Sequence, residues 1–128
     1  MIYLDTSVAP AQLLAEDREP PPSLWRAPLI ASRLLAHELW NRIHARNLGH
    51  SHGDDVRSLL GRVALIEHAP PVLVRASEPF PRPVRTLDAI HLASIEFLCS
   101  RGQVVELASY DERLNGAARG LGIPLAAL

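Results

Sequence analysis

The chain has 128 residues, enough for one domain and too few for two ordinary ones. Apolar residues make up 48% and charged residues 21%, a balance that excludes an intrinsically disordered chain. The single cysteine, Cys99, excludes an internal disulfide and a zinc site of four cysteines. The formal net charge of −1 is unlike that of a protein that coats nucleic-acid duplexes, because such proteins are normally basic.

The N-terminal residues, MIYLD, contain neither a basic segment nor a long apolar run. No window of the sequence approaches the ~18 uninterrupted apolar residues of a membrane span. We therefore expect no secretory signal, no association with a membrane and a cytoplasmic location.

The first half of the chain alternates short apolar runs with helical patterns. In chain order, the residues predict a strand over 2–4, a helix over 8–14 and a strand over 28–32. Two helices follow, one over 33–48 and one from 51 onward. Asp5, Thr6 and Ser7 follow the first strand, and all three residue types favour helix N-caps. His50 and His52 lie beside glycines, so we expect them in a solvated loop.

The second half continues this alternation. It predicts a strand over 64–67 and helices over 71–78 and 87–100. A strand over 104–108, a helix over 110–121 and an edge strand over 123–128 are expected to follow. Thr86 is predicted to cap the long helix. The spacing of this helix places five residues on its buried side: Leu87, Ile90, Ser94, Phe97 and Leu98. Strands separated by helices require crossover connections, so the predicted fold class is α/β, a single domain with a mostly parallel sheet of about four to five strands flanked by helices.

Polar residues occur where predicted strands end and helices begin. In a parallel sheet these points share one edge, at which α/β proteins bind their ligands. Asp5 ends the first strand, Ser109 and Asp111 follow a later strand, Asp88 lies in the first turn of a helix, and Glu38 borders the apolar stripe of its helix. Each carboxylate also has a purely structural alternative, as a helix cap, as a partner of the helix dipole or, for Glu38, as half of an ion pair.

Carboxylates that gather at one edge repel one another by roughly 3–4 kcal/mol per pair at ~4–5 Å and an effective dielectric near ~20. Such crowding raises pKa values or requires a cation. Magnesium or manganese suits an all-carboxylate site that retains waters. A cation of this kind activates water for phosphodiester hydrolysis, so the acids predict a metal-dependent hydrolase.

Four segments match the motifs of a known family. They cover residues 2–7 (IYLDTS), 32–42 (which include Glu38), 85–93 (RTLDAIHLA) and 108–114 (ASYDERL). In these motifs and their order the chain resembles PIN-domain proteins, and more narrowly the VapC-type toxin ribonucleases of type II toxin–antitoxin systems. The likeness covers nearly the whole chain, and the segments around Asp88 and Asp111 are its most specific parts.

The resemblance implies a PIN-like fold and a magnesium- or manganese-dependent endoribonuclease that inhibits growth by cutting RNA. It also implies a homodimer that a VapB-like antitoxin neutralises. Carried over by position, the metal-binding carboxylates are Asp5, Glu38, Asp88 and Asp111. Thr6 matches the residue that orients the first aspartate, and Ser109 matches a threonine or serine beside the last acid.

Basic side chains must offset the acids if RNA binds, because the bulk charge does not attract it. Candidates near the acidic edge are Arg42, Arg46, Arg85 and Arg113, each with an ordinary solvated role as its alternative. His91 lies one turn after the aspartate of the long helix, and we interpret it as a packing residue that can also hydrogen-bond near the site.

Two other functions fit parts of the sequence. One is a non-catalytic PIN-like module that acts in a complex with an antitoxin and operator DNA. The other is a phosphatase with Asp5 as nucleophile, which would need a second aspartate at position 7 and a lysine. Position 7 is Ser7 and the chain contains no lysine, so this reading is disfavoured.

Overall fold

The computed structural model describes residues 1–128. Four short strands run through it: β1 (Ile2–Leu4), β2 (Leu29–Ser32), β3 (Val63–Ile66) and β4 (Glu106–Ala108). They form one sheet in the order β3-β2-β1-β4, and every strand pair is parallel. The α/β class and the parallel sheet predicted from the sequence are confirmed, with four strands.

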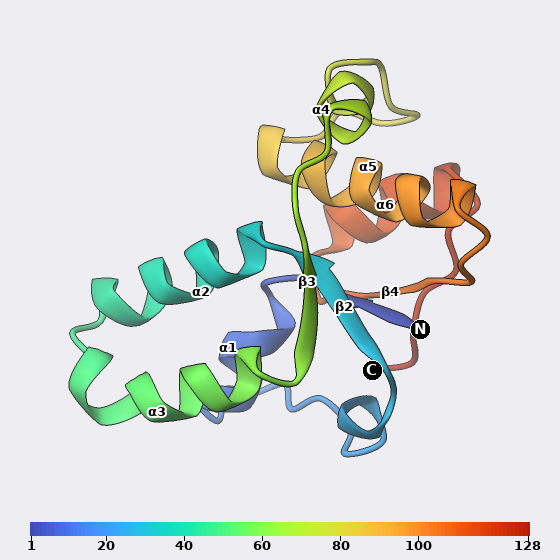
Figure 1. Cartoon of the computed structure of the whole chain (residues 1–128). Coiled ribbons are helices and arrows are strands. Elements are labelled where there is room, and N and C mark those ends of the chain that lie inside the picture. The colour runs from blue at the N-terminus through green and yellow to red at the C-terminus, as the bar shows by residue number, and fades with distance from the viewer.

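Helices connect the strands on both sides of the sheet (Figure 1). In chain order they are α1 (Val8–Leu13), the 3-10 helix η1 (Leu24–Arg26), α2 (Leu34–Ala45), α3 (Gly49–Leu60), α4 (Pro70–Ala76), α5 (Thr86–Ser100) and α6 (Glu112–Gly120). None of these helices combines the length and the apolar character needed to cross a bilayer.

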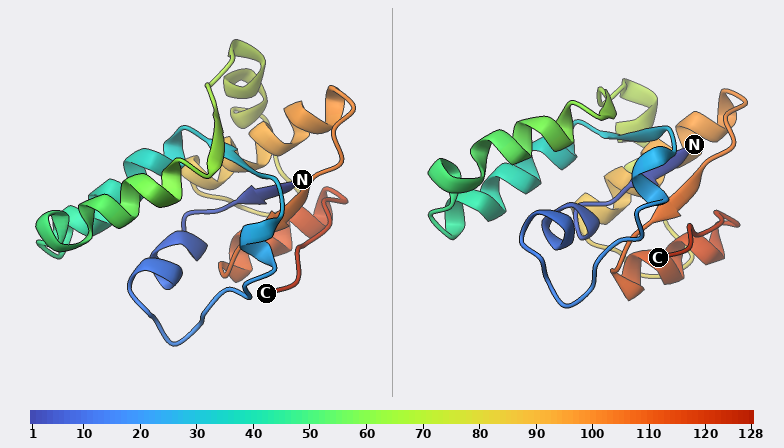
Figure 2. Two further views of the ribbon diagram at one scale, coloured as in Figure 1. Left: turned by 60° about the horizontal axis from the view of Figure 1, so that its bottom comes forward. Right: turned by 90° about the horizontal axis from the view of Figure 1, so that it is seen from below.

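Each face of the sheet has its own hydrophobic core, because successive side chains of a strand point to opposite faces. Leu4 of β1 and Ala31 of β2 lie in the first core, together with residues of α1, α2 and α3. Tyr3 and Ile30, their neighbours in sequence, lie in the second core with residues of α5 and α6. The fold therefore has three layers, and Figure 2 shows α2 and α3 on one side of the sheet and α5 and α6 on the other.

The neighbouring strands β1 and β4 lead to helices on opposite faces. Helix α1 contributes Val8 to the first core, whereas α6 contributes Leu114 to the second. Where connections from adjacent parallel strands diverge in this way, a crevice opens at the carboxyl ends of the strands. The residues that follow β1 and β4 therefore lie at the position where an α/β fold binds its ligand.

Two expectations about the ends of elements are wrong. Helix α3 begins at Gly49, so His50 and His52 belong to a helix and not to a loop, and the backbone N–H of His52 donates to the Leu48 carbonyl at 2.9 Å. Residues 123–128 form no strand beyond a single bridge between Leu107 and Leu125. Proline lacks the N–H that a strand ladder needs, and a proline at position 124 interrupts the pairing.

The side of α5 that faces the core also differs from the expectation. Of the five residues expected there, Ser94 and Leu98 are buried, whereas Leu87, Ile90 and Phe97 are exposed or only half-buried. Ala89, Leu92 and Ile95 are buried instead, together with the polar side chain of His91. Helix α4 packs across α5, so α5 is apolar on several sides and its periodicity does not decide which side meets the sheet. The helix also begins at Thr86 itself, one residue earlier than expected.

The layered arrangement predicts that Leu92→Ala lowers the free energy of unfolding by about 2–5 kcal/mol, because it leaves a cavity in the second core. Leu92 is fully buried there. Val104→Ala is the matched control, since Val104 is 81% exposed and its truncation should change stability by less than about 0.5 kcal/mol. Urea unfolding curves measure both, and equal losses would contradict the placement of α5.

Candidate active site

Four carboxylates from distant parts of the sequence line one small hollow at the carboxyl end of the sheet. The hollow has a volume of about 240 Å³, and its wall consists of Asp5, Thr6, Ser7, Glu38, Arg42, Arg85, Leu87, Asp88 and Asp111. All four acids expected at the site therefore meet in one place, beside two of the expected arginines. Arg113 is not part of the wall, and only its backbone N–H contacts the site, at Asp111.

Local structure explains how each acid reaches the hollow. Asp5 follows β1, and its backbone N–H continues the ladder by donating to the carbonyl of Ala108 on β4 at 3.0 Å. Asp111 is the N-cap of α6, where Oδ1 accepts hydrogen bonds from two backbone N–H groups of the first turn. Asp88 lies in the first turn of α5 and accepts from the backbone N–H of Arg85 at 3.3 Å. Glu38 projects from the second turn of α2.

Asp5 is held by two hydroxyl groups. Its Oδ2 accepts from Ser7 Oγ at 2.6 Å and from Ser109 Oγ at 2.8 Å, and the residue is only 6% exposed. The resemblance assigns the orienting role to Thr6, but the Thr6 hydroxyl is buried and has no hydrogen-bond partner. Ser7 takes that role, and the sequence signal for it is a serine two residues after an aspartate in a tight turn.

Glu38 is held by His91 through a buried chain of hydrogen bonds. His91 Nε2 lies 2.9 Å from Glu38 Oε1, and His91 Nδ1 lies 2.8 Å from the Tyr3 hydroxyl. The Tyr3 oxygen also accepts from the backbone N–H of Ser32 at 3.1 Å. Because an ionised carboxylate only accepts hydrogen bonds, the Nε2–H of His91 donates to Glu38. Arg42, four residues after Glu38 on the same helix, is not its ion-pair partner, because Glu38 pairs with His91. His91 is buried and also positions an acid.

Burial keeps Tyr3 in its protonated form, since it raises the pKa of the phenol far above the usual range. The negative charges of Asp5 and Glu38 raise this pKa further, against the hydrogen bonds that lower it. The phenol of Tyr3 therefore keeps its own proton.

Each of the four carboxylates uses one oxygen in these hydrogen bonds and leaves the other free of protein donors. The oxygens in use are Asp5 Oδ2, Glu38 Oε1, Asp88 Oδ2 and Asp111 Oδ1. The free oxygens are Asp5 Oδ1, Glu38 Oε2, Asp88 Oδ1 and Asp111 Oδ2. The wall of the hollow therefore contains four carboxylates, each oriented through one oxygen and each with a second oxygen that accepts no hydrogen bond from the protein; Asp5 Oδ1 lies 4.0 Å from His91 Nε2.

Mutual repulsion among these acids is visible at Asp88. Burial is the main cause that raises the pKa of this carboxyl, and the charges of Asp111 and Asp5 raise it further. The hydrogen bond from the Arg85 backbone and the nearby His91 oppose the rise. A cation that entered the hollow would relieve this repulsion.

The donor set suits a hard divalent cation, because all four ligand candidates are carboxylate oxygens. The four carboxylates line one hollow, but no three acidic, histidine or cysteine side chains lie close enough together to hold a metal ion jointly. Magnesium commonly binds through one or two carboxylates and keeps several waters, so an open hollow with free carboxylate oxygens fits such an ion without a cage.

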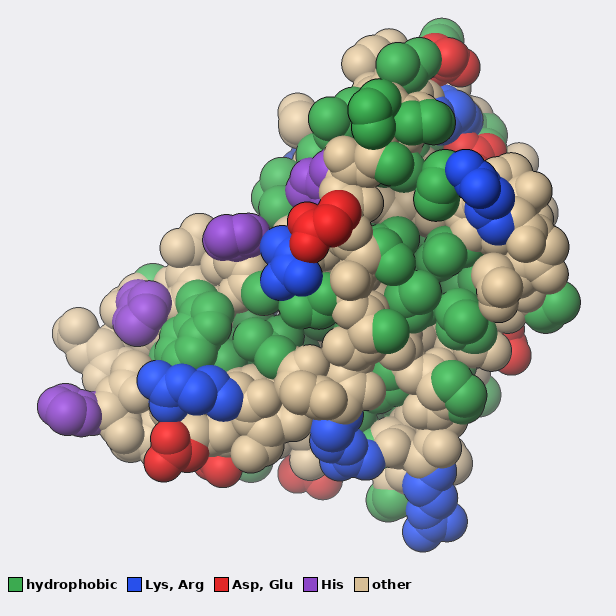
Figure 3. All heavy atoms as spheres, viewed as in Figure 1, with side chains coloured by type: hydrophobic (Ala, Val, Ile, Leu, Met, Phe, Trp, Pro, Cys, Tyr) green, Lys and Arg blue, Asp and Glu red, His purple; other side chains and the backbone are tan.

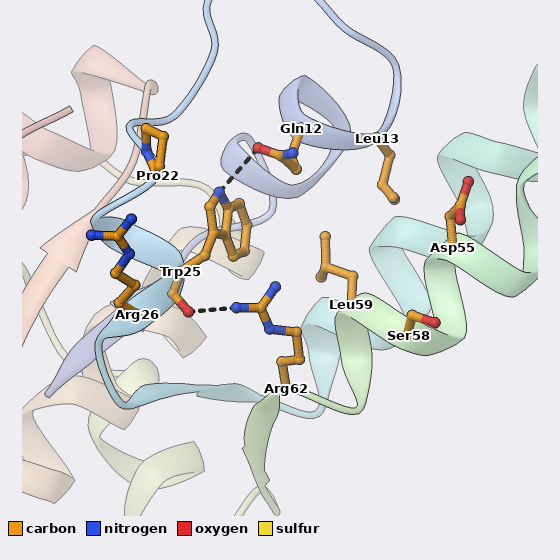
Figure 4. Close-up of a pocket in the computed structure, with 9 residues that line it drawn as sticks. All are labelled: Gln12, Leu13, Pro22, Trp25, Arg26, Asp55, Ser58, Leu59 and Arg62. Atoms are coloured by element: carbon orange, nitrogen blue, oxygen red, sulfur yellow. Dashed lines mark hydrogen bonds between the residues drawn. The ribbon is translucent and has the colours of Figure 1, made fainter.

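A larger cavity elsewhere lacks these features (Figure 4). It has a volume of about 520 Å³ and lies between α1, η1 and α3. In it the indole N–H of Trp25 donates to Gln12 at 3.0 Å, and Arg62 donates to the Trp25 carbonyl. Its wall contains a single acid, Asp55, so it offers no cluster of carboxylates for a cation.

The buried hydrogen-bond chain predicts that Tyr3→Phe lowers the free energy of unfolding by about 1–3 kcal/mol, because it leaves buried polar groups of Ser32 and His91 without a partner. Tyr110→Phe is the matched control, since the Tyr110 hydroxyl makes no hydrogen bond within the protein. Denaturant titrations compare the two, and an unchanged stability for Tyr3→Phe would contradict the chain.

The crowding of acids predicts that Asp88→Asn stabilises the protein in the presence of a chelator. A carboxyl whose folded pKa lies above its ordinary value of 3.8 contributes most to stability at low pH, and that contribution is lost as the pH rises through the folded pKa. Unfolding curves from about pH 4 to about pH 7 should therefore show a decline in the wild type that the asparagine variant lacks.

Asp55→Asn serves as the control for that measurement, because Asp55 is exposed and lies outside the hollow. An Asp88→Asn variant that is less stable than the wild type at neutral pH would show that the carboxylate is well compensated and would remove the argument for electrostatic crowding.

Comparisons with known proteins do not assign the chain to a family. No family model matches it, and no curated protein matches it at a significant level.

Proposed function

We propose that the chain is a magnesium- or manganese-dependent endoribonuclease. One observation carries the proposal: four oriented carboxylates, each with a free oxygen, line a single hollow at the point where β1 and β4 lead to opposite faces. Motif similarity to VapC-type PIN-domain proteins supports RNA as the substrate.

Two arginines give the acidic hollow a means of receiving a phosphate. Arg42 and Arg85 lie in its wall, and neither forms an ion pair with a carboxylate of the protein. Their guanidinium groups are therefore available to offset the charge of a phosphodiester beside the acids. A bound divalent cation would supply Lewis acidity toward the phosphate and a more acidic water.

The chain's own residues hold this site in shape before substrate arrives. Ser7 and Ser109 fix the rotamer of Asp5, and the proton on His91 Nε2 fixes Glu38. Backbone donors at the starts of α5 and α6 hold the other two acids. Preorganised charges of this kind avoid reorganisation during reaction, which is the main electrostatic contribution to catalysis.

The proposal extends, on the strength of the resemblance, to a toxin that inhibits growth by RNA cleavage, forms homodimers and is neutralised by a VapB-like antitoxin. A phosphatase with Asp5 as nucleophile gains no support, because Ser7 stands where its second aspartate would be and the wall of the hollow contains no lysine. The non-catalytic alternative is an outcome of the experiment below.

We expect Asp5→Asn and Glu38→Gln each to lower RNA cleavage at least about 100-fold, because each removes a negative charge from the hollow while preserving size. Cleavage of an end-labelled RNA is measured in magnesium, in manganese and in excess chelator. Asp55→Asn is the control and should cleave as the wild type does.

Thermal unfolding of each variant separates a lost site from a lost fold. Cleavage that persists in chelator, or in both substituted proteins, would contradict the proposal. Folded wild-type protein that binds a partner but never cleaves RNA would instead favour the non-catalytic module.

A further inference from the structure

A second cavity adjoins the acidic hollow. It has a volume of about 560 Å³, and its wall consists of Ser7, Ala11, Glu16, Asp17, Arg18, Arg42, Arg46 and Tyr110. Ser7 and Arg42 also belong to the wall of the hollow, so the two cavities meet at these residues. We call the second cavity the arginine groove.

The wall of the arginine groove holds three arginines and two acids, Glu16 and Asp17, so its formal charge is positive. Arg18 and Arg42 form no ion pair with any carboxylate. Arg46 has only a long contact of 3.9 Å to Glu16, between side chains that are 58% and 37% exposed. Exposed pairs of this kind contribute little, so Arg46 can exchange Glu16 for a phosphate at small cost.

The groove also contains an aromatic ring that is connected to the acids. The backbone N–H of Tyr110 donates to Ser7 Oγ at 2.9 Å, and the same oxygen donates to Asp5 at 2.6 Å. The Arg18 guanidinium lies over the Tyr110 ring, 5.6 Å from its centroid. A third cavity, of about 470 Å³, also has Arg18 and Tyr110 in its wall, so Tyr110 borders two cavities while part of its side chain packs against the first core.

We propose that the arginine groove is a subsite for the RNA strand next to the cleaved bond, with phosphates on Arg42 and Arg46 and one nucleobase stacked on Tyr110 beside Arg18. The subsite rests on the proposed nuclease function. Aromatic rings beside arginines bind bases through stacking, which every base can provide. A base can lie flat on the ring only when it is unpaired, so the groove receives a single strand.

The surface charge of the protein indicates that RNA is bound by a few local contacts and is not attracted over long distances. On the face that Figure 3 shows, basic and acidic side chains are scattered and form no continuous basic patch. The net charge of −1 likewise provides no long-range attraction for RNA. Affinity therefore has to come from a few contacts near the acids, and the arginine groove combines charge and an aromatic ring there.

Binding without cleavage tests the subsite. The affinity of a short unstructured RNA is measured by fluorescence anisotropy in chelator, over a range of salt concentrations. Tyr110→Leu should weaken binding by about 5- to 100-fold and leave the salt dependence unchanged, because it removes stacking and keeps apolar volume. Tyr110→Phe should bind within about twofold of the wild type, since the ring is retained.

The arginines should behave differently from the ring. Arg46→Ala should weaken binding and lower the slope of log affinity against log salt by about 0.7, the value for one lost phosphate contact on a single strand. Arg26→Ala is the matched control, because Arg26 is also exposed and lies in the wall of the remote cavity of Figure 4. Its slope should equal that of the wild type.

RNAs that carry a single abasic nucleotide at successive positions locate the stacked base. One position should weaken binding to the wild type as much as Tyr110→Leu does, and that position should have no effect in the Tyr110→Leu protein. Arg46 is exposed, so Arg46→Ala still tests the subsite if the Tyr110→Leu protein fails to fold.

The subsite is overturned if Tyr110→Leu and Arg46→Ala bind as tightly as the wild type, or if the wild type does not bind RNA. A wild type that binds with these dependences but does not cleave in magnesium or manganese overturns the nuclease and leaves the subsite standing. A wild type that cleaves, with groove variants that bind and cleave equally well, overturns the subsite alone.

Discussion

The hydrogen bonds from Ser7 and Ser109 to the Asp5 carboxylate join the two halves of the site. Ser7 begins the connection from β1, and Ser109 begins the connection from β4. Ser109 Oγ also accepts from the backbone N–H of Asp111 at 2.9 Å, which fixes the start of α6. The β1–β4 ladder brings Asp5 and Ser109 to the same edge of the sheet, and these side-chain bonds fix the Asp5 carboxylate there and link it to the backbone of Tyr110 and Asp111.

A hollow lined by four carboxylates is costly to fold, and the surrounding structure limits that cost. Every acid has at least one donor behind it, from serine hydroxyls, backbone N–H groups or the His91 imidazole. At Asp88, burial first and then the charges of Asp111 and Asp5 still raise the pKa of the carboxyl above its ordinary value. Binding sites often retain unfavourable interactions of this kind, because the bound ligand, and not the folded protein, neutralises their charge.

Sequence reasoning reached the acids because each lies at a point that can be read locally. Asp5 follows a buried strand, Asp88 lies in a first helical turn, and Asp111 precedes a helix. Among the residues that hold them it reached Ser109, whose hydroxyl donates to Asp5, but it chose Thr6 instead of Ser7 and did not connect His91 with Glu38. Ser7 looks like one of three equivalent caps, and His91 looks like a packing residue, because hydrogen bonds to a side chain 53 residues away leave no local pattern.

The amino-acid order alone therefore determined the alternation of strands and helices, the parallel sheet and the identity of the four acids, since these depend on periodicity, caps and short motifs. Only the tertiary structure decided which side of α5 is buried, that Arg113 stays outside the hollow, and that Arg42 joins the hollow to the arginine groove. Those features depend on how layers pack around a sheet, and packing brings together side chains whose separation along the chain carries no signal.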